Sequence, residues 1–194
     1  MIIHISGPSG SGKTFLGNKL KENFGSKIVV KDLDDLRYEF IINKYGSYKN
    51  MWKKKDFIWD KDAYQNWIYE YIKKQKKPII FVGLNHMPWW NKDLYYDLQS
   101  GINFYIKLTT EKIFEQRCKR FLSDVFEDNF KKTVKDIIKN ETKTIENLQE
   151  ALKHECSYKE IKDLTDKWNK DYKKQNYKFL SSDKIFNEIS KLLS

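Results

Sequence analysis

Short apolar runs alternate with longer segments of mixed polarity along the chain. The runs lie at residues 1–6, 27–31, 79–82, 103–108 and 177–180, and the first three are rich in β-branched residues. Runs of this length and composition are typical of buried strands. Because each run is followed by room for a helix, the pattern predicts an α/β fold with a parallel sheet covered on both faces. Right-handed crossovers then place the C-terminal ends of the strands at one edge, where we expect substrates to bind.

The segments between the runs carry helix signals. Gly25 ends the first helical segment, and Pro78 ends another before the third run. The expected helices cover residues 14–23, 35–43, 62–74, 92–99, 110–121, most of 123–152, about 159–172, and 183–193. The two helical segments after residue 123 that precede the last run are so polar that we expect neither to lie deep in the core.

The length and composition fit one folded domain. A chain of 194 residues, of which 40% are hydrophobic and 15% aromatic, can bury a core although 33% of its residues are charged. We therefore expect a single domain over residues 1–194. No apolar stretch is long enough to cross a membrane, and residues 1–6 lack the features of a signal peptide, so the sequence predicts a cytoplasmic protein with no membrane partner. Cys118 and Cys156 are expected to be free thiols.

The formal net charge of +10 is compatible with a nucleic-acid partner. A solvated lysine surface is the alternative, because all but three of the 37 basic residues are lysines. The three arginines are Arg37, Arg117 and Arg120. A guanidinium offers phosphate a planar, bidentate contact that lysine does not, so each arginine is a candidate anion contact.

One motif carries the strongest functional signal. Gly7-Pro8-Ser9-Gly10-Ser11-Gly12-Lys13-Thr14 matches G-x-x-x-x-G-K-[ST], and it lies between a predicted strand and a predicted helix. In such a P-loop the backbone amides and the helix N-terminus bind the phosphates of ATP. We expect Lys13 to reach the β- and γ-phosphates and Thr14 to ligate Mg²⁺. A glycine-rich turn without a nucleotide is the alternative.

The second run is followed by a cluster of acids, Asp32-Leu-Asp34-Asp35-Leu-Arg37. Carboxylates at this edge of the sheet face the γ-phosphate, where one can help hold Mg²⁺ and another can accept the proton of an attacking hydroxyl. We assign Asp32 to the metal, Asp34 to the proton, and Asp35 and Arg37 to the acceptor. The alternative is that the acids only cap the next helix, and that Arg37 is an ordinary surface residue.

Two more segments supply candidate site residues. Arg117 and Arg120 share one face of a predicted helix. They could close over the γ-phosphate as part of a lid at about 117–155. The alternative is that they are ordinary cationic residues near a helix C-terminus. The third run ends in Gly-Leu-Asn85, and we assign Asn85 to the acceptor. Nearby, His86 is a weaker candidate base. Trp89 and Trp90 could stack a base or could be ordinary packing residues.

The order of these features resembles that of the small nucleoside- and nucleotide-kinase-like P-loop enzymes over most of the chain. The resemblance implies a three-layer α/β/α fold with a five-stranded parallel sheet in the order 2-3-1-4-5, a helical lid, ATP and Mg²⁺. Residues 34–37 are similar to the Asp-Asp-x-Arg segment of bacteriophage-type polynucleotide 5′-kinases, which implies that Asp34 is the base and Arg37 the clamp. The Asp32-x-Asp34 spacing equally resembles shikimate kinases, in which the first Asp assists Mg²⁺ and the second holds the acceptor. Gly-Leu-Asn85 departs from relatives that carry an acid there, which puts more weight on Thr14 and Asp32.

Three functional hypotheses follow. The first is an ATP-dependent kinase that acts on a hydroxyl of a nucleoside, a nucleotide or a similar small metabolite. The second is a kinase of a nucleic-acid hydroxyl, which the +10 charge favours and which steeply salt-dependent oligonucleotide binding would reveal. The third is an ATP-binding regulator without phosphoryl transfer, against which the paired acids and the lid arginines stand.

Overall fold

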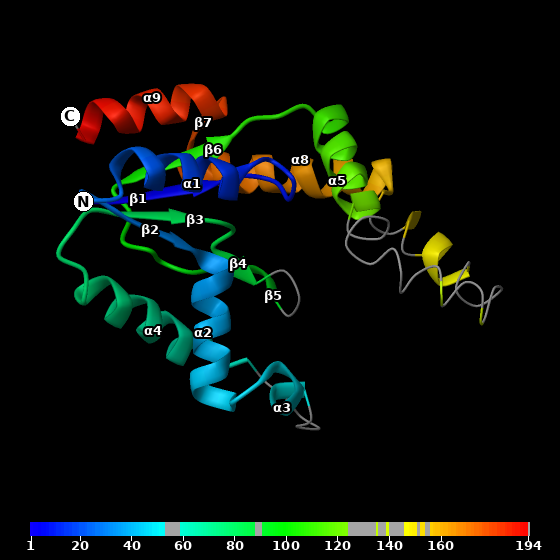
Figure 1. Cartoon of the computed structure of the whole chain (residues 1–194), viewed down its shortest axis with the longest axis horizontal. Coiled ribbons are helices and arrows are strands. Elements are labelled where there is room, and N and C mark those ends of the chain that lie inside the picture. Colours follow the sequence, from blue (N-terminus) through cyan, green and yellow to red (C-terminus); the bar gives the residue numbers. More distant parts are fainter. Residues whose placement is uncertain are drawn as a thin grey trace. The chain divides into compact units, whose positions relative to one another are not determined.

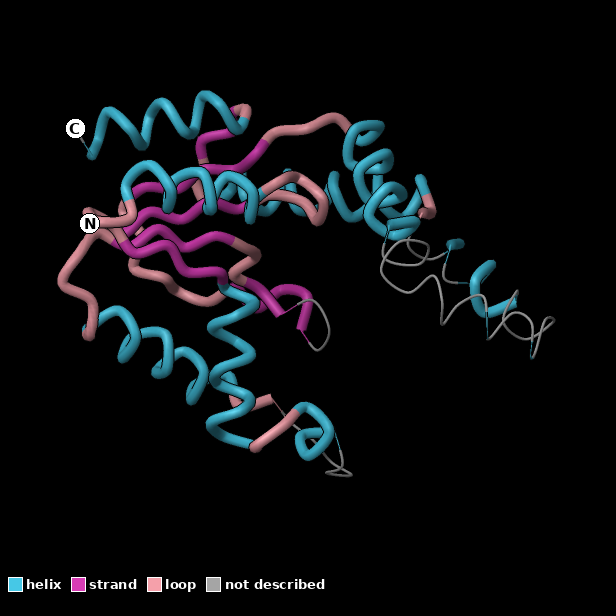
Figure 2. The backbone as a smooth tube through the Cα atoms, in the orientation of Figure 1, coloured by secondary structure: helices cyan, strands magenta, loops and turns pink. Residues whose placement is uncertain are grey.

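The structure is a computed structural model that describes residues 1–52, 59–87, 91–123, 135, 139, 146–150, 152–153 and 156–193. It has an α/β fold, drawn by element in Figure 1 and by secondary structure in Figure 2. The chain divides into two compact units. The sheet unit comprises Met1–Gly7, Gly12–Ile106 and Asn176–Ser194, and the helical unit comprises Pro8–Ser11 and Lys107–Gln175.

The main sheet of the sheet unit has five strands, which are β1 (Ile2–Ser6), β2 (Val29–Asp32), β3 (Ile79–Val82), β6 (Ile102–Ile106) and β7 (Lys178–Leu180). Their spatial order is β2-β3-β1-β6-β7, and every neighbouring pair is parallel. Counted along the chain within this sheet, the order is 2-3-1-4-5. The predicted fold class and sheet order are therefore confirmed.

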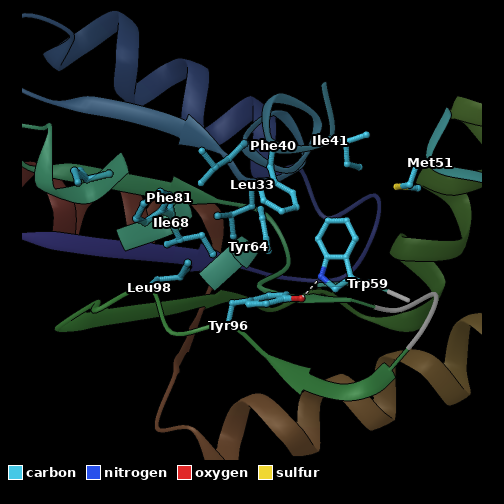
Figure 3. Packing of buried hydrophobic residues seen from close by; sticks show 12 residues of the cluster. Leu33, Phe40, Ile41, Met51, Trp59, Tyr64, Ile68, Phe81, Tyr96 and Leu98 are labelled. Atoms are coloured by element: carbon cyan, nitrogen blue, oxygen red, sulfur yellow. Dashed lines mark hydrogen bonds between the residues drawn. The ribbon is translucent and has the colours of Figure 1, made fainter. Parts of the chain in front are cut away.

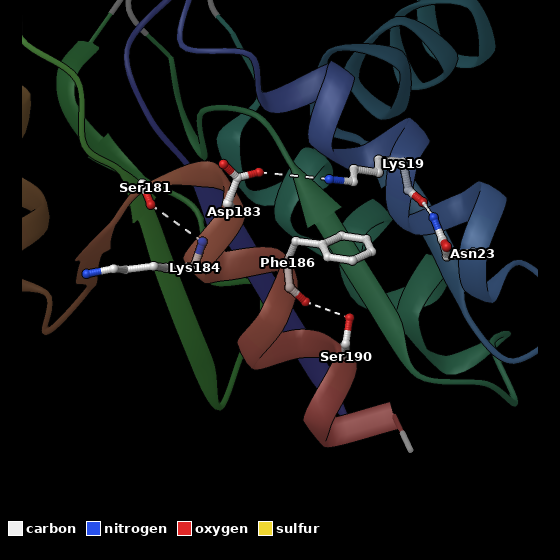
Figure 4. Close-up of polar contacts among 7 residues, drawn as sticks. All are labelled: Lys19, Asn23, Ser181, Asp183, Lys184, Phe186 and Ser190. Carbon is white, nitrogen blue, oxygen red and sulfur yellow. Dashed lines mark hydrogen bonds and ion pairs between the residues drawn. The ribbon is translucent and has the colours of Figure 1, made fainter.

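Two helices cover one face of this sheet, namely α1 (Lys13–Phe24) and α9 (Ser182–Leu193) (Figure 1). Gly17 lets α1 approach the sheet closely, because a Cβ there would lie 3.2 Å from Val82 Cγ1 and 3.3 Å from Val30 Cγ1. The Lys19 ammonium joins the two helices, since it lies 4.4 Å from the centroid of the Phe186 ring and 3.9 Å from Oδ1 of Asp183 (Figure 4).

The helices after β2 build the core on the opposite face. These are α2 (Leu33–Tyr45), α3 (Tyr48–Trp52) and α4 (Lys61–Lys73). Phe40 lies at the centre of an aromatic cluster, with ring centroids 5.3 Å from Trp59 and 5.2 Å from Tyr64 (Figure 3). The indole N–H of Trp59 donates a 2.6 Å hydrogen bond to the hydroxyl of Tyr96, so this buried polar pair satisfies itself.

A buried histidine ties β1 to two neighbouring segments. His4 Nε2 donates to the carbonyl oxygen of Gly83 over 2.9 Å, because a carbonyl can only accept. His4 Nδ1 therefore accepts a hydrogen bond from the hydroxyl of Tyr177, 2.5 Å away, just before β7. Burial lowers the pKa of His4 to about 4, so the ring is neutral at pH 7 and holds these two bonds in one tautomer.

One predicted element is wrong. Residues 92–99 were expected to be helical, but Asn91–Tyr95 is strand β5, which pairs antiparallel with β4 (His86–Met87). The hairpin ends at Tyr95 and is followed by Tyr96 and Leu98, whose side chains are buried in the same hydrophobic cluster as Phe40. Tyr95 and Tyr96, in the middle of the segment, also have strong strand propensity, which a helix assignment disregards.

The helical unit contains α5 (Thr110–Ser123) and α8 (Tyr158–Lys174). The Tyr158 hydroxyl donates a 2.7 Å hydrogen bond to Glu111 and so joins the starts of the two helices. The polar segment over about 159–172 was expected not to lie deep in the core, and in α8 only one face of the helix is buried. The buried residues on that face follow a helical spacing and are Ile161, Thr165, Trp168 and Tyr172.

Much of the predicted lid at about 117–155 lies outside the described residues, so it stays a prediction. Cys118 and Cys156 are both described, and the structure forms no disulfide bond with either of them among the described residues. Within the part of the chain that the structure describes, no helix combines the length and the apolar character that a membrane crossing requires.

Candidate functional site

Two glycines of the loop after β1 have a left-handed backbone conformation. Gly10 and Gly12 both have φ +83°, a left-handed conformation that favours glycine. Gly12 is the N-cap of α1 and provides no side chain to bind the first amides of that helix. A helix N-terminus without a side-chain cap presents unpaired N–H groups and partial positive charge, which is a binding site for phosphate.

Lys13 and Thr14 begin α1 with both side chains in polar contacts. Lys13 Nζ donates a 2.9 Å hydrogen bond to the carbonyl oxygen of Gly7, so the side chain folds back along the loop. Thr14 Oγ1 donates to Oδ2 of Asp32 over 3.3 Å. The two residues predicted to hold Mg²⁺ are therefore neighbours in the sheet unit.

Asp32 serves two neighbours at once. Its Oδ1 accepts a 2.9 Å hydrogen bond from the amide of Asp34 and caps α2, while its Oδ2 faces Thr14. Burial, more than any other influence, raises the pKa of Asp32, and the charges of Asp34 and Asp35 add to this effect. Burial destabilises the negative charge of this carboxylate, and a bound cation would stabilise that charge. Such an environment suits a metal ligand.

The other predicted acids lie in the first turn of α2 instead of at the strand end. Asp34 and Asp35 are both exposed there, and the helix N-terminus stabilises their negative charge. Arg37 Nη1 donates a 2.8 Å hydrogen bond to Oδ1 of Asp34. Only 12% of the Arg37 side chain is exposed, compared with 77% for Asp34. The guanidinium is thus the buried partner of this pair and the carboxylate is the accessible one.

Aromatic residues surround the Arg37 guanidinium, and sequence reasoning had not assigned them. Tyr64 hydrogen-bonds to it, and burial raises the Tyr64 pKa well above the usual range although the positive charge opposes that rise. Burial also raises the pKa values of Tyr48 and Tyr96. The positive charge of Arg37 is close enough to both residues to lower these pKa values in part. The Nε of Arg37 is buried without a partner among the described residues. The feature of the sequence that could have indicated these residues is the high aromatic content around residues 45–67.

Gly83 is a second residue that the sequence had not assigned to the site. Its φ of +129° is restricted for L side chains, and a Cβ there would lie 3.0 Å from Leu33 Cβ and 3.6 Å from Asp32 Oδ1. Since Gly83 follows β3 directly, it allows the chain to pass beside the start of α2. The absence of a side chain at position 83 thus helps to place Asp32.

The predicted residues after β3 are engaged within the protein. Asn85 is buried, and its Nδ2 donates a 3.0 Å hydrogen bond to the carbonyl oxygen of Tyr96. Its assignment to the acceptor stays a prediction. His86 is buried with its ring stacked on Tyr95 at 5.4 Å between centroids. Trp89 and Trp90 lie outside the described residues.

In the helical unit, both predicted lid arginines contact residues of the loop. Arg120 Nη2 lies 3.5 Å from Oγ of Ser9. A Cβ at Gly10 would lie 3.3 Å from Arg117 Cγ, so this arginine packs against the loop backbone. Arg117 and Arg120 are therefore beside the residues whose backbone is expected to bind phosphate.

ATP and Mg²⁺ fit these residues. Ser11 Oγ is buried and has no hydrogen-bond partner among the described residues, which leaves a donor for a phosphate oxygen. Thr14 and Asp32 offer the oxygen atoms that Mg²⁺ prefers, and this ion commonly takes one or two protein ligands beside the phosphates. Among the described residues, no three His, Cys, Asp or Glu side chains gather as a separate metal site.

No known family model matches the chain, and no curated protein is similar to it in sequence. Among solved structures, the chain is similar to the crystal structure of shikimate kinase from Bacteroides thetaiotaomicron, with 14% identity and a TM-score of 0.38. The match covers 61% of this chain and 63% of that chain.

Proposed function

We propose that the protein is an ATP-dependent phosphotransferase that moves the γ-phosphoryl group to a hydroxyl of a small acceptor, a nucleoside, a nucleotide or a similar metabolite. The observation that carries this proposal is the contact of Thr14 with Asp32, beside the uncapped N-terminus of α1. This contact joins the end of the phosphate loop to the acids at the start of α2. A loop that only turned the chain would not need the pairing.

Each residue then has a role in holding or preparing the reactants. Lys13 would exchange its bond to Gly7 for contacts with the β- and γ-phosphates of ATP, and Thr14 and Asp32 would hold Mg²⁺. When bound, Mg²⁺ neutralises phosphate charge and orients the γ-phosphoryl group. Arg117 and Arg120, which already contact the loop, neutralise the charge that develops on transfer.

Asp34 is the proposed general base. Its Oδ1 accepts from Arg37, and no described residue donates to its Oδ2, so this exposed oxygen can take a proton from the acceptor hydroxyl. Arg37 keeps the carboxylate oriented and offers its remaining N–H groups to an anionic part of the acceptor. Asp35, one residue further in the same helical turn, is placed to bind another hydroxyl.

Replacement of Asp34 by Asn tests this role. The variant should lose about 100- to 10,000-fold in transfer rate, because a positioned base contributes that much, yet it should bind ATP as well as the wild type. Asp62→Asn is the matched control, since Asp62 is also an exposed acid in the first turn of a helix, α4. Transfer of labelled γ-phosphate to nucleosides, nucleotides, sugars and 5′-hydroxyl oligonucleotides identifies the acceptor. Unchanged turnover in Asp34→Asn would contradict the assignment, and ATP binding without transfer to any acceptor would favour a regulator.

A further inference from the structure

A groove runs along the exposed face of α2, next to α4. Its volume is about 410 Å³, and it is lined by Tyr38, Glu39, Ile42, Asn43 and Trp67. Pockets of this size accommodate small organic ligands. Trp67 comes from α4 and the other four residues come from α2. The groove therefore lies within the sheet unit, where both helices are described.

The groove begins one helical turn beyond the proposed base. Tyr38 follows Asp34, and Glu39 follows Asp35, at the i, i+4 spacing that places side chains on one face of a helix. Four residues correspond to about 6 Å along the helix axis. A ligand whose ring lies in the groove could thus extend a short arm with a hydroxyl group to the acids at the start of α2.

The walls of the groove favour a planar ring. Tyr38 and Trp67 contribute aromatic side chains, and 51% of Tyr38 is exposed. The Tyr38 ring is also stacked on Tyr48, with 5.8 Å between centroids and 28° between planes. This stacking limits the motion of Tyr38, so less conformational entropy is lost when a second ring stacks on it. Ile42 adds an aliphatic surface to the same groove.

The polar side chains of the groove favour a neutral ligand. Glu39 is already paired with Lys31 at 2.6 Å, and the five lining residues include no lysine or arginine. A phosphate group would therefore meet the Lys31 ammonium only in competition with the Glu39 carboxylate. Asn43 is exposed, and its amide makes no hydrogen bond to any described residue, so it can donate to and accept from the edge of a heterocycle.

We propose that this groove binds the neutral, planar ring of the acceptor, so that the acceptor is a nucleoside-like compound whose sugar hydroxyl points to Asp34. This inference rests on the proposed function, because it assigns the groove to the acceptor of that reaction. Tyr38 provides the stacking surface, Tyr48 holds Tyr38 in position, and Asn43 reads the edge of the ring.

The test measures ring binding without any need for transfer. Cytidine, uridine, guanosine and ribose are titrated calorimetrically into the protein, with and without Mg²⁺ and a non-hydrolysable ATP analogue to fill the nucleotide site. At least one nucleoside should bind and ribose should not. Tyr38→Ala should weaken that binding about tenfold, and Tyr38→Phe should change it less than about twofold, because stacking needs the ring alone. Tyr158→Ala removes a similarly exposed tyrosine, 42% accessible, from the helical unit and should leave binding unchanged.

The outcomes separate this inference from the proposed function. Nucleoside binding that depends on Tyr38 but leads to no transfer would support the groove and contradict the kinase. Transfer to an acceptor with the same KM in the wild type and Tyr38→Ala would support the kinase and overturn the groove. If no nucleoside binds, or if Tyr38→Ala binds as the wild type does while both proteins unfold at the same temperature, the inference is wrong.

Discussion

The hydroxyl of Thr14 donates a hydrogen bond to Oδ2 of Asp32, 3.3 Å away, while the other oxygen of that carboxylate caps α2. One side chain thereby links the loop after β1 to the helix that carries the proposed base. The capping and the metal-binding interpretations of the acids are consequently compatible at Asp32, because each uses a different oxygen atom.

Two substitutions of Asp32 separate these roles. Asn caps helices about as well as Asp, and burial disfavours the Asp32 charge, so Asp32→Asn should keep the stability of the protein. Its Mg²⁺-dependent turnover should fall roughly 10- to 100-fold. Asp32→Ala should lose the turnover and also about 1 kcal/mol of unfolding free energy. Urea unfolding and Mg²⁺ titration of turnover measure both effects, and full turnover in Asp32→Asn would contradict a metal role.

Gly83 should not tolerate a side chain. Gly83→Ala places a methyl group 3.0 Å from Leu33 Cβ at a strained φ of +129°, so we expect a loss of about 1–3 kcal/mol in unfolding free energy and a lower turnover. Gly101→Ala is the control, because a Cβ there meets no atom within 4 Å. Thermal unfolding should distinguish the two variants. Equal stabilities would show that the chain relaxes at position 83 without cost.

Gly10 and Gly46 permit a matched test of the loop. Both glycines have a positive φ, which is +83° at Gly10 and +75° at Gly46. The nearest atom to a Cβ would be Arg117 Cγ at 3.3 Å for Gly10 and Asn50 Nδ2 at 3.4 Å for Gly46, and both atoms belong to side chains. Both alanine variants should lose about 1 kcal/mol of stability. Only Gly10→Ala should weaken ATP binding, roughly tenfold, which corresponds to 1.4 kcal/mol. A similar loss of ATP affinity in Gly46→Ala would remove the argument for a phosphate-shaped loop.

The protein should lose stability in mild acid through His4. Its folded-state pKa of about 4 lies below the ordinary 6.5, so the unfolded chain binds the proton more readily and the unfolding free energy falls as the pH drops through this interval. We expect a loss of about 2 kcal/mol between pH 7 and pH 5 from this group alone. Urea unfolding at both pH values measures it. His4→Gln should show a smaller difference between the two, and an equal difference would assign the acid sensitivity to other groups.

The sequence predicted the sheet and the loop because their signals are local. The strand runs and the glycine motif each depend on residues that are adjacent in the chain, and the structure has strands and φ angles to match, for example at Gly10 and Gly12. The helix after the second run was predicted to begin at Asp35, but α2 begins at Leu33 and includes Asp34 in its first turn.

The remaining features depend on partners that are distant in the chain. The β4-β5 hairpin is stabilised where Tyr96 meets Asn85 and Trp59, and nothing in residues 92–99 alone indicates those contacts. The burial of α8 was different, since the spacing of Ile161, Thr165, Trp168 and Tyr172 was already visible in the sequence. The high average polarity of residues 159–172 led to the expectation that this segment lies outside the core, and the periodic spacing of its apolar residues was not considered.

The bond between His4 and Tyr177 also has a consequence for biosynthesis. The histidine belongs to the first strand and its partner to a segment 173 residues later, so the growing chain carries an unsatisfied polar group in β1 until the ribosome has passed Tyr177. The central strand of the sheet therefore cannot reach its final state while the earlier part of the chain emerges. We expect ribosome-bound nascent chains that stop before residue 177 to be sensitive to protease and to bind chaperones.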